Sequence, residues 1–354
     1  MALTQQQKDL LFLRETRQAV NTVGRIDYKS GVSGAPMFIS KVGFLAKLII
    51  KFKGTVTCSH ASKTTFSKAA DAPWAIIKNI GLKMNGGVGI WNTTGFGAYL
   101  RNLLDVRNNT LDSIVAGRDV FEFGNTVSVG GTANALKFTL ELPIQINDRD
   151  PVGLLMLQSD KVVCQLDVAW DVPAVLMTDT DITTTVTGSL TVTTEVFEIP
   201  DNEDARPDPR LLHVVEEDQI PLVGTGKTRY TFRPGKIHQR AIFRILINGA
   251  AANEADILDM ALVYNQNKTP YSVDADILRY LNRKRYGRDL PAGVYVWDWG
   301  YQGIPMLGNG RDYVNTAKIT EFWNVVNIAS GAVFGTNNNI IQCVTEALEP
   351  MKVA

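Results

Sequence analysis

Histidine and cysteine, the residues that most often hold metal ions or carry acid–base chemistry at neutral pH, are scarce in this sequence. Its 354 residues include three histidines and three cysteines: His60, His213, His238, Cys58, Cys164 and Cys343. No two histidines are spaced as a metal-binding pair, and Cys58-Ser59-His60 has no second pair to complete four ligands. The odd number and wide spacing of the cysteines argue against a disulfide framework. We therefore expect buried, reduced thiols, no metal site and no cofactor.

An excess of charge and long apolar runs are also lacking. Lys and Arg total 36, Asp and Glu total 36, and the net charge is zero. No field attracts the whole chain to polyanions, so we do not expect specific nucleic-acid binding. No run approaches the ~18 to 20 apolar residues of a membrane-spanning helix. The N-terminus has no basic stretch leading into a short apolar segment, so we expect synthesis in a cytoplasm.

One short motif resembles a phosphate-binding loop but lacks its structural context. Residues 224–228 read Gly-Thr-Gly-Lys-Thr, yet Pro221 stands where the Walker pattern requires glycine. Residues 229–234, Arg-Tyr-Thr-Phe-Arg-Pro, follow where a helix must begin, so no helix N-terminus would bind the phosphate. We interpret the motif as a turn between strands. The sequence contains no Gly-x-Ser-x-Gly elbow, and we assign no catalytic, cofactor-binding or metal-binding residue.

The N-terminal segment has helical spacing. Gln7 follows Thr4 by three residues, as in a capping box, and Leu10, Leu13 and Val20 recur near the helical period. This predicts an amphipathic helix from Thr4 to near Gly24. Its charges are of mixed sign, which favours packing on protein over binding to lipid.

From about residue 36 the hydrophobic period changes from 3.6 to 2. Apolar and polar residues alternate in 43–53, 138–147 and 161–170, which is typical of strands with one buried face. Pro143 indicates a sheet edge or a bulge. Asn, Gly and Thr clusters, such as those at 85–87 and 130–132, provide the turns. The pattern predicts antiparallel sandwiches rather than alternating strands and helices.

The order of predicted elements occurs twice. Strand, strand, helix and three strands are expected in the first half at 43–53, 74–84, 97–104, 138–147, 161–170 and 189–199. The same order is expected in the second half at 240–248, 259–265, 274–286, 293–299, 319–328 and 340–348, with Asp274 capping the helix. A proline-rich polar segment, 199–210, lies between the halves. Two similar sandwiches in tandem explain this order.

One basic cluster stands out at the end of the second predicted helix: Arg279, Arg283, Lys284, Arg285 and Arg288. Nucleic-acid binding is one interpretation. Because the charge is balanced elsewhere in the chain, we favour a solvated helix face or a salt-bridged contact between subunits.

Residues 283–298, which read Arg-Lys-Arg-Tyr-Gly-Arg-Asp-Leu-Pro-Ala-Gly-Val-Tyr-Val-Trp-Asp, resemble a segment of the major capsid proteins of tectiviruses. These viruses are tailless icosahedral bacteriophages with an internal membrane. In that family a basic helix end runs into Asp-aromatic-Pro-x-Gly-Val-Tyr-x-x-Asp at the start of a strand in the second jelly roll. Leu290 replaces the aromatic residue here. The motif covers a small part of the chain, whereas the order of elements covers nearly all of it.

The resemblance implies an all-β fold of two tandem antiparallel eight-stranded jelly rolls, at 31–203 and 204–354, with short helices and an N-terminal amphipathic helix or arm at 1–30. It implies a major capsid protein without enzymatic activity. Three copies would form a homotrimeric, pseudo-hexagonal capsomer that tiles an icosahedral shell around an internal membrane. Expected partners are further copies, neighbouring capsomers, penton or minor capsid proteins and, through the N-terminal helix, the membrane. The expected location is the virion.

Two other classes of function stay open. A carbohydrate-binding or spike-type module of two β-sandwiches would use Trp91, Trp297 and Trp299, although aromatic residues on strands more often fill a core. A hydrolase would use a pair of Asp or Glu residues at the rim of a sandwich, and the sequence selects no such pair.

Overall fold

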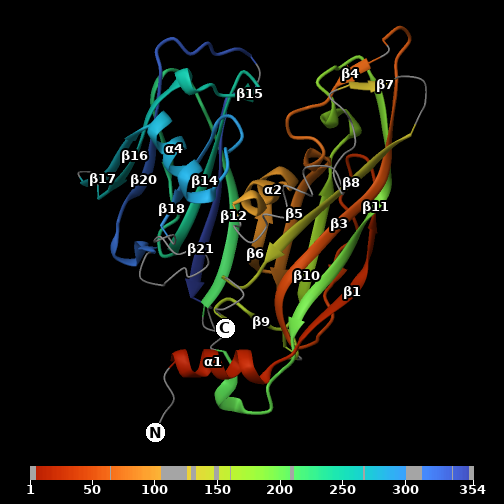
Figure 1. The fold of residues 1–354 in the computed structure, drawn as a ribbon, viewed down its shortest axis with the longest axis vertical. Coiled ribbons are helices and arrows are strands. Elements are labelled where there is room, and N and C mark those ends of the chain that lie inside the picture. Colours follow the sequence, from red (N-terminus) through yellow and green to blue (C-terminus); the bar gives the residue numbers. More distant parts are fainter. Residues whose placement is uncertain are drawn as a thin grey trace. The chain divides into compact units, whose positions relative to one another are not determined.

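The computed structural model describes residues 5–63, 65–104, 126–128, 133–146, 151–159, 161–207, 211–265, 268–299, 313–336 and 338–350. The chain divides into two compact units, Met1–Val214 and Val215–Ala354, and antiparallel strands dominate both (Figure 1). The limits predicted for the arm and the two jelly rolls stay predictions. The predicted helix start at Thr4 and the predicted turn at 130–132 lie outside the described residues.

In the first unit the strands pair in two series of four. The order β1-β11-β3-β8 is formed by β1 (Gln18–Asp27), β11 (Thr183–Phe197), β3 (Phe44–Ser59) and β8 (Asn134–Pro143). The order β2-β10-β5-β6 is formed by β2 (Met37–Phe38), β10 (Cys164–Trp170), β5 (Ile77–Met84) and β6 (Val88–Thr93). Three short strands accompany them: β4 (Thr65–Ser67), β7 (Thr126–Ser128) and β9 (Leu155–Met156).

The second unit repeats this pairing. The order β12-β21-β14-β18 is formed by β12 (Leu211–Pro221), β21 (Ile340–Pro350), β14 (Ile237–Ile247) and β18 (Val294–Asp298). The order β13-β20-β16-β17 is formed by β13 (Gly226–Thr231), β20 (Phe322–Ile328), β16 (Ile257–Tyr264) and β17 (Lys268–Asp274). The short strands β15 (Ala250–Ala251) and β19 (Val314–Asn315) pair with β14.

Each unit is therefore a jelly roll, and the predicted all-β fold with two tandem units is confirmed. The detail of eight strands per jelly roll stays a prediction, because short strands add to both units. Pro143 is the last residue of β8, the end strand of its series, as its position in the sequence predicted. The motif at 224–228 leads from β12 into β13, which confirms the turn.

One α-helix occupies the same place in each unit. In the first, α2 (Gly95–Leu103) follows β6, and Thr94 caps it by accepting a hydrogen bond from the Gly97 amide at 3.0 Å. In the second, α4 (Ala275–Tyr286) follows β17, with Asp274 at the N-cap position and Gly287 ending it at φ 68°. Short 3₁₀ turns lie at η1 (Trp74–Ile76), η4 (Pro173–Leu176), η5 (Glu203–Ala205), η6 (Glu254–Asp256) and η7 (Thr316–Lys318).

The predicted N-terminal helix is shorter than expected. The helix α1 (Gln5–Glu15) ends well before Gly24, and β1 begins at Gln18. Val20, expected on the helix, pairs with Glu195 of β11. The segment contains Val, Asn and Thr, which are poor helix formers, and β11 offers it a ladder of backbone hydrogen bonds. No helix in the described ranges is long and apolar enough to cross a membrane.

Candidate functional site

The three cysteines lie in different strands, Cys58 in β3, Cys164 in β10 and Cys343 in β21. Cys58, Cys164 and Cys343 are buried and free, as expected. Burial raises the pKa of all three thiols, that of Cys164 to about 12. Nothing in the part of the chain that the structure describes brings together three or more His, Cys, Asp or Glu side chains that could hold a metal ion.

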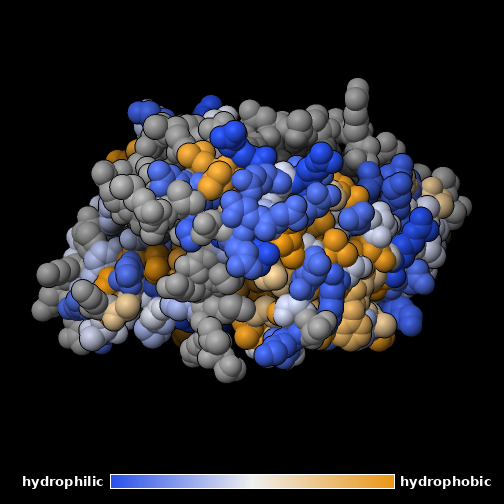
Figure 2. Space-filling model, turned by 90° about the horizontal axis from the view of Figure 1, so that it is seen from below, coloured by the Kyte–Doolittle hydropathy of each residue, from blue (hydrophilic) through white to orange (hydrophobic). Residues whose placement is uncertain are grey.

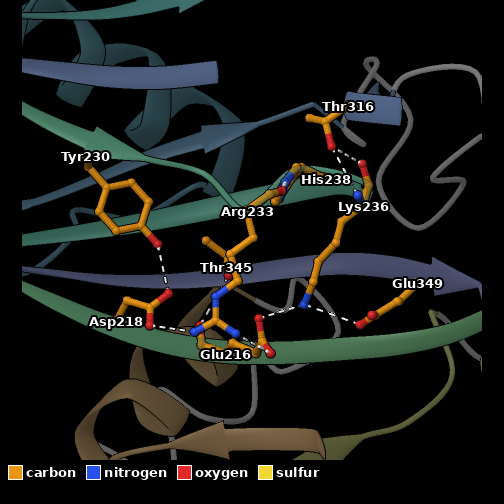
Figure 3. Close-up of polar contacts among 9 residues, drawn as sticks. All are labelled: Glu216, Asp218, Tyr230, Arg233, Lys236, His238, Thr316, Thr345 and Glu349. Atoms are coloured by element: carbon orange, nitrogen blue, oxygen red, sulfur yellow. Dashed lines mark hydrogen bonds and ion pairs between the residues drawn. The ribbon is translucent and has the colours of Figure 1, made fainter. Parts of the chain in front are cut away.

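A cluster of charged and polar side chains lies in the second unit, around Glu216 of β12 (Figure 3). The Lys236 Nζ atom lies 2.7 Å from a Glu216 carboxylate oxygen and 3.3 Å from one of Glu349. The Arg233 guanidinium spans Glu216 and Asp218, at 2.9 and 2.8 Å. Each cation therefore bridges two carboxylates, and the cluster ties β12 to the end of β21.

Two buried side chains border this cluster without completing a catalytic group. The Tyr230 hydroxyl donates to Asp218 at 3.3 Å, and burial raises the pKa of this tyrosine. The His238 Nε2–H donates to the Arg233 carbonyl at 3.0 Å, and burial lowers the pKa of the imidazole. The Nδ1 atom of His238 has no hydrogen-bond partner among the described residues. Because Lys236 and Arg233 pair with the carboxylates around them, we assign the cluster a structural role.

The predicted basic cluster is used mostly within its own unit. The Arg279 guanidinium lies 2.6 Å from Glu254 and donates to the Leu290 carbonyl at 3.2 Å. Arg285 donates to the Asp298 carbonyl at 2.7 Å. These contacts fix α4 to its neighbours within the chain, and a salt-bridged contact of the cluster with another subunit stays a prediction.

The three tryptophans considered for sugar binding are in packed positions. Trp91 is buried and donates to Thr93 at 2.8 Å, and Trp297 is buried and donates to Asn324 at 2.8 Å. Trp299 packs partly buried against the core of the second unit. A sugar could stack on Trp91 or Trp297 only if the ring were uncovered.

An asparagine in each jelly roll was missed by sequence reasoning. The side-chain amide of Asn282 on α4 donates to the Val296 carbonyl and accepts from the Val296 amide, both at 2.9 Å. Asn102 on α2 makes the same two bonds to Glu141, at 2.6 and 2.8 Å. The strands that receive these bonds, β18 and β8, are equivalent in the two units. Each asparagine is the eighth residue of its helix. An alignment of the two halves of the sequence would reveal this shared position.

The surface of α4 carries apolar side chains that face solvent. Ile277, Tyr280 and Leu281 are spaced i, i+3 and i+4, so they lie on one side of the helix. Their exposed fractions are 47%, 64% and 46%. The opposite side of the helix packs on its unit through Ala275, Leu278, Asn282 and Tyr286. We call the three exposed residues the α4 face.

The helix α1 packs on the first unit through a buried aromatic side chain. Phe12 is 0% exposed and packs edge-on against Phe44 and Phe197, with ring centroids 5.7 and 5.4 Å apart. Leu10 and Leu13 stay exposed. Among the coloured residues seen from below, the end where α1 lies, hydrophilic and hydrophobic residues are interspersed (Figure 2).

The fold is found in solved structures of viral capsid proteins. The STIV major capsid protein is 12% identical, with a TM-score of 0.70 over 94% of this chain and 97% of that chain. A chain in the atomic structure of Sulfolobus turreted icosahedral virus is 13% identical, with a TM-score of 0.71 over 94% and 91%. The major capsid protein P2 of bacteriophage PM2 is 10% identical, with a TM-score of 0.57 over 95% and 99%. No protein-family model and no curated protein matches the chain.

At these identities the likeness shows the fold. The chain is a double jelly roll like those of viral major capsid proteins, and the resemblance stated from residues 283–298 and the order of elements is confirmed at that level.

Proposed function

We propose that this chain is the major capsid protein of an icosahedral virus and that it acts in the virion as a structural protein, without enzymatic activity. The observation that carries the proposal is the match over both jelly rolls to capsid proteins of nearly the same extent, 94% of this chain and 97% of the STIV protein. A single sandwich recurs in many functions. Two in tandem, with matched order and matched helices, are a far more specific arrangement.

We further propose that three copies form the capsomer. Six jelly rolls in a ring would give a pseudo-hexagonal outline, which tiles a closed shell. The zero net charge supports close packing, because it removes long-range repulsion between copies. Neighbouring capsomers and penton or minor capsid proteins would be the remaining protein partners.

Contact of α1 with an internal membrane is the finer part of the proposal, as is the assignment to a bacteriophage of the tectivirus kind. The exposed Leu10 and Leu13 support it, since Phe12 packs into the aromatic cluster while these two side chains stay free to meet lipid. The mixed charges of α1 limit the contact to a shallow one, because binding to anionic lipid favours a purely basic polar face.

Electron microscopy of the purified protein tests the capsomer. Six-cornered particles with the mass of three 39.0 kDa chains are expected. A stable monomer at every protein and salt concentration, with no larger particle, would refute the proposal. A glycan array separates the carbohydrate-binding alternative, because saturable binding to a sugar is expected only of that module.

Removing residues 1–15 tests the membrane contact while leaving β1 intact. Particles of the truncated chain are expected to lose lipid during purification. Leu13→Ser, which keeps the Phe12 attachment, is expected to weaken lipid retention in part. Full retention of lipid by the truncated particles would refute this contact.

A further inference from the structure

A turn at one end of the first unit is built around the ring of His60. This residue follows β3 directly, beyond the last residue pair of the ladder between β3 and β11. Its Nδ1 atom accepts two backbone hydrogen bonds, from the amide of Ser62 at 3.0 Å and from the amide of Lys63 at 2.8 Å. The imidazole therefore organises residues 60–63, which we call the His60 turn.

These bonds decide which nitrogen of the ring carries a proton. A ring nitrogen that accepts from N–H groups has no proton of its own, so the neutral ring holds its proton on Nε2. The Nε2 atom lies 3.3 Å from a carboxylate oxygen of Asp181, in the segment just before β11. The ring thus has two partners, the backbone of its own turn through Nδ1 and a carboxylate through Nε2.

Within the described residues, the charged groups at the His60 turn are Lys63, Asp179 and Asp181. The Lys63 Nζ atom lies 2.8 Å from an oxygen of Asp181 and 3.3 Å from one of Asp179. The hydrogen bond from Lys63 lowers the pKa of Asp181. This carboxylate therefore stays ionised through the range around pH ~6.5 in which an imidazole ordinarily titrates. Asp181 remains a partner for the ring whether the ring is neutral or charged.

We propose that His60 is an acid switch that opens the His60 turn. When Nδ1 takes up a proton from water, it becomes a donor, and its two bonds to the amides of Ser62 and Lys63 break. The contact of Nε2 with Asp181 survives, because the charged ring is attracted to the carboxylate. The imidazolium and the Lys63 ammonium then compete for the same carboxylate and repel each other, which favours departure of the turn.

The position of the turn determines what its opening changes. The ladder between β3 and β11 ends before His60, so it does not depend on the two broken bonds. Acid is therefore expected to loosen this end of the unit while the sheet stays folded. The other end of β3 begins at Phe44, which packs on α1, and the end beyond Ser59 lies near β4 and β7 (Figure 1). The switch belongs to the first unit by itself, so it goes beyond the proposed capsid role and does not depend on assembly.

Electron paramagnetic resonance of a spin label at Ser62→Cys tests the switch in the full chain. The label attaches selectively, because Ser62 is exposed and the native cysteines are buried. The substitution keeps the backbone amide that bonds to the ring. From about pH 8 to about pH 5, the ratio of mobile to immobile label is expected to rise at least about tenfold, which is the effect of losing one ordinary hydrogen bond.

Two substitutions of His60 separate the ring proton from other effects of acid. His60→Asn provides an amide oxygen that accepts from backbone N–H groups further along the turn and does not titrate, so the label should stay immobile at both pH values. His60→Ala provides no acceptor, so the label should be mobile at both. The matched control carries the label at Val223→Cys, 91% exposed in the second unit, and its spectrum should be the same at both.

The other outcomes overturn the switch. A label at Ser62→Cys that stays immobile at acid pH, or that becomes equally mobile in His60→Asn, shows that the His60 proton does not open the turn. An immobile label in His60→Ala at about pH 8 shows that the ring does not hold the turn. A change at Val223→Cys in step with that at Ser62→Cys shows that acid loosens the whole chain. None of these results bears on the proposed capsid role, which the size and outline of the particles test.

Discussion

Replacing Asn282 by alanine removes the two hydrogen bonds that join α4 to β18. The Val296 amide and carbonyl then lose their partners, and both Val296 and Asn282 are buried, so water does not replace the lost bonds readily. A buried backbone group without a partner costs about 1 to 3 kcal/mol. We therefore expect Asn282→Ala to lower the free energy of unfolding of the second unit by about 2 to 6 kcal/mol. At roughly 3 °C per kcal/mol, its melting temperature should fall by ~6 to 18 °C.

Near-UV circular dichroism and calorimetry of purified protein measure this loss. Asn102→Ala should destabilise the first unit by a similar amount, because it breaks the equivalent bonds to Glu141. Asn338→Ala, at an exposed position, serves as the control and should stay within about 0.5 kcal/mol of the wild type. If Asn282→Ala melts at the same temperature as the control, the two bonds of Asn282 do not stabilise the contact of α4 with β18. The position that Asn282 shares with Asn102 then has no effect on stability.

Three further predictions follow from buried side chains. Phe12→Ala should weaken the packing of α1 on its unit by about 3 to 5 kcal/mol and so speed proteolytic removal of the helix. Leu13→Ala, at a more exposed position, should leave the cleavage rate unchanged. Equal cleavage rates in the two variants would contradict the attachment through Phe12. Burial lowers the pKa of His238, so the unfolded chain binds more protons, and stability should fall as pH drops below the ordinary value of 6.5. His238→Phe should flatten urea midpoints over that range, and an unchanged slope would refute the assignment. The three buried cysteines, with the pKa of Cys164 raised to about 12, should resist a thiol reagent at pH 8 until the protein unfolds; rapid labelling of the native protein would contradict their burial.

Much of the fold follows from local pattern. The alternation in β8 and β10 has one buried face, and both strands overlap the predicted segments 138–147 and 161–170, although β8 already ends at Pro143. The helix α4 starts directly after Asp274, at the predicted N-cap position, although the Asp274 side chain makes no capping hydrogen bond. These elements are predictable because the alternation of apolar and polar residues in a half-exposed strand, and the residue type at the start of a helix, are visible in the local sequence.

The features that the sequence did not predict are those that depend on contacts with distant parts of the chain. The spacing of Leu10, Leu13 and Val20 predicts helix over the residues of β1, yet β1 pairs with a strand far along the chain, as in Val20 with Glu195 of β11. The strand β13 is missing from the predicted order of elements, because its first residues belong to the glycine-containing motif predicted as a turn. The asparagine bonds could not be predicted for the same reason, because Asn102 binds a residue 39 positions away in the sequence. A single side chain also leaves no repeating pattern in the sequence.

The asparagine bonds also bear on what happens when many copies of the chain crowd together. The outermost strand of a sheet attracts strands from other molecules through its unpaired backbone groups. Here Asn102 and Asn282 occupy both such groups at one residue of β8 and of β18, and Pro143 ends β8 without an N–H to offer. On the far side of the first series, β1 is interrupted by a bulge between Thr22 and Gly24. These features hinder edge-to-edge pairing of strands between crowded copies, which would give open-ended aggregates. Contacts through side chains, which can form closed assemblies, are favoured instead.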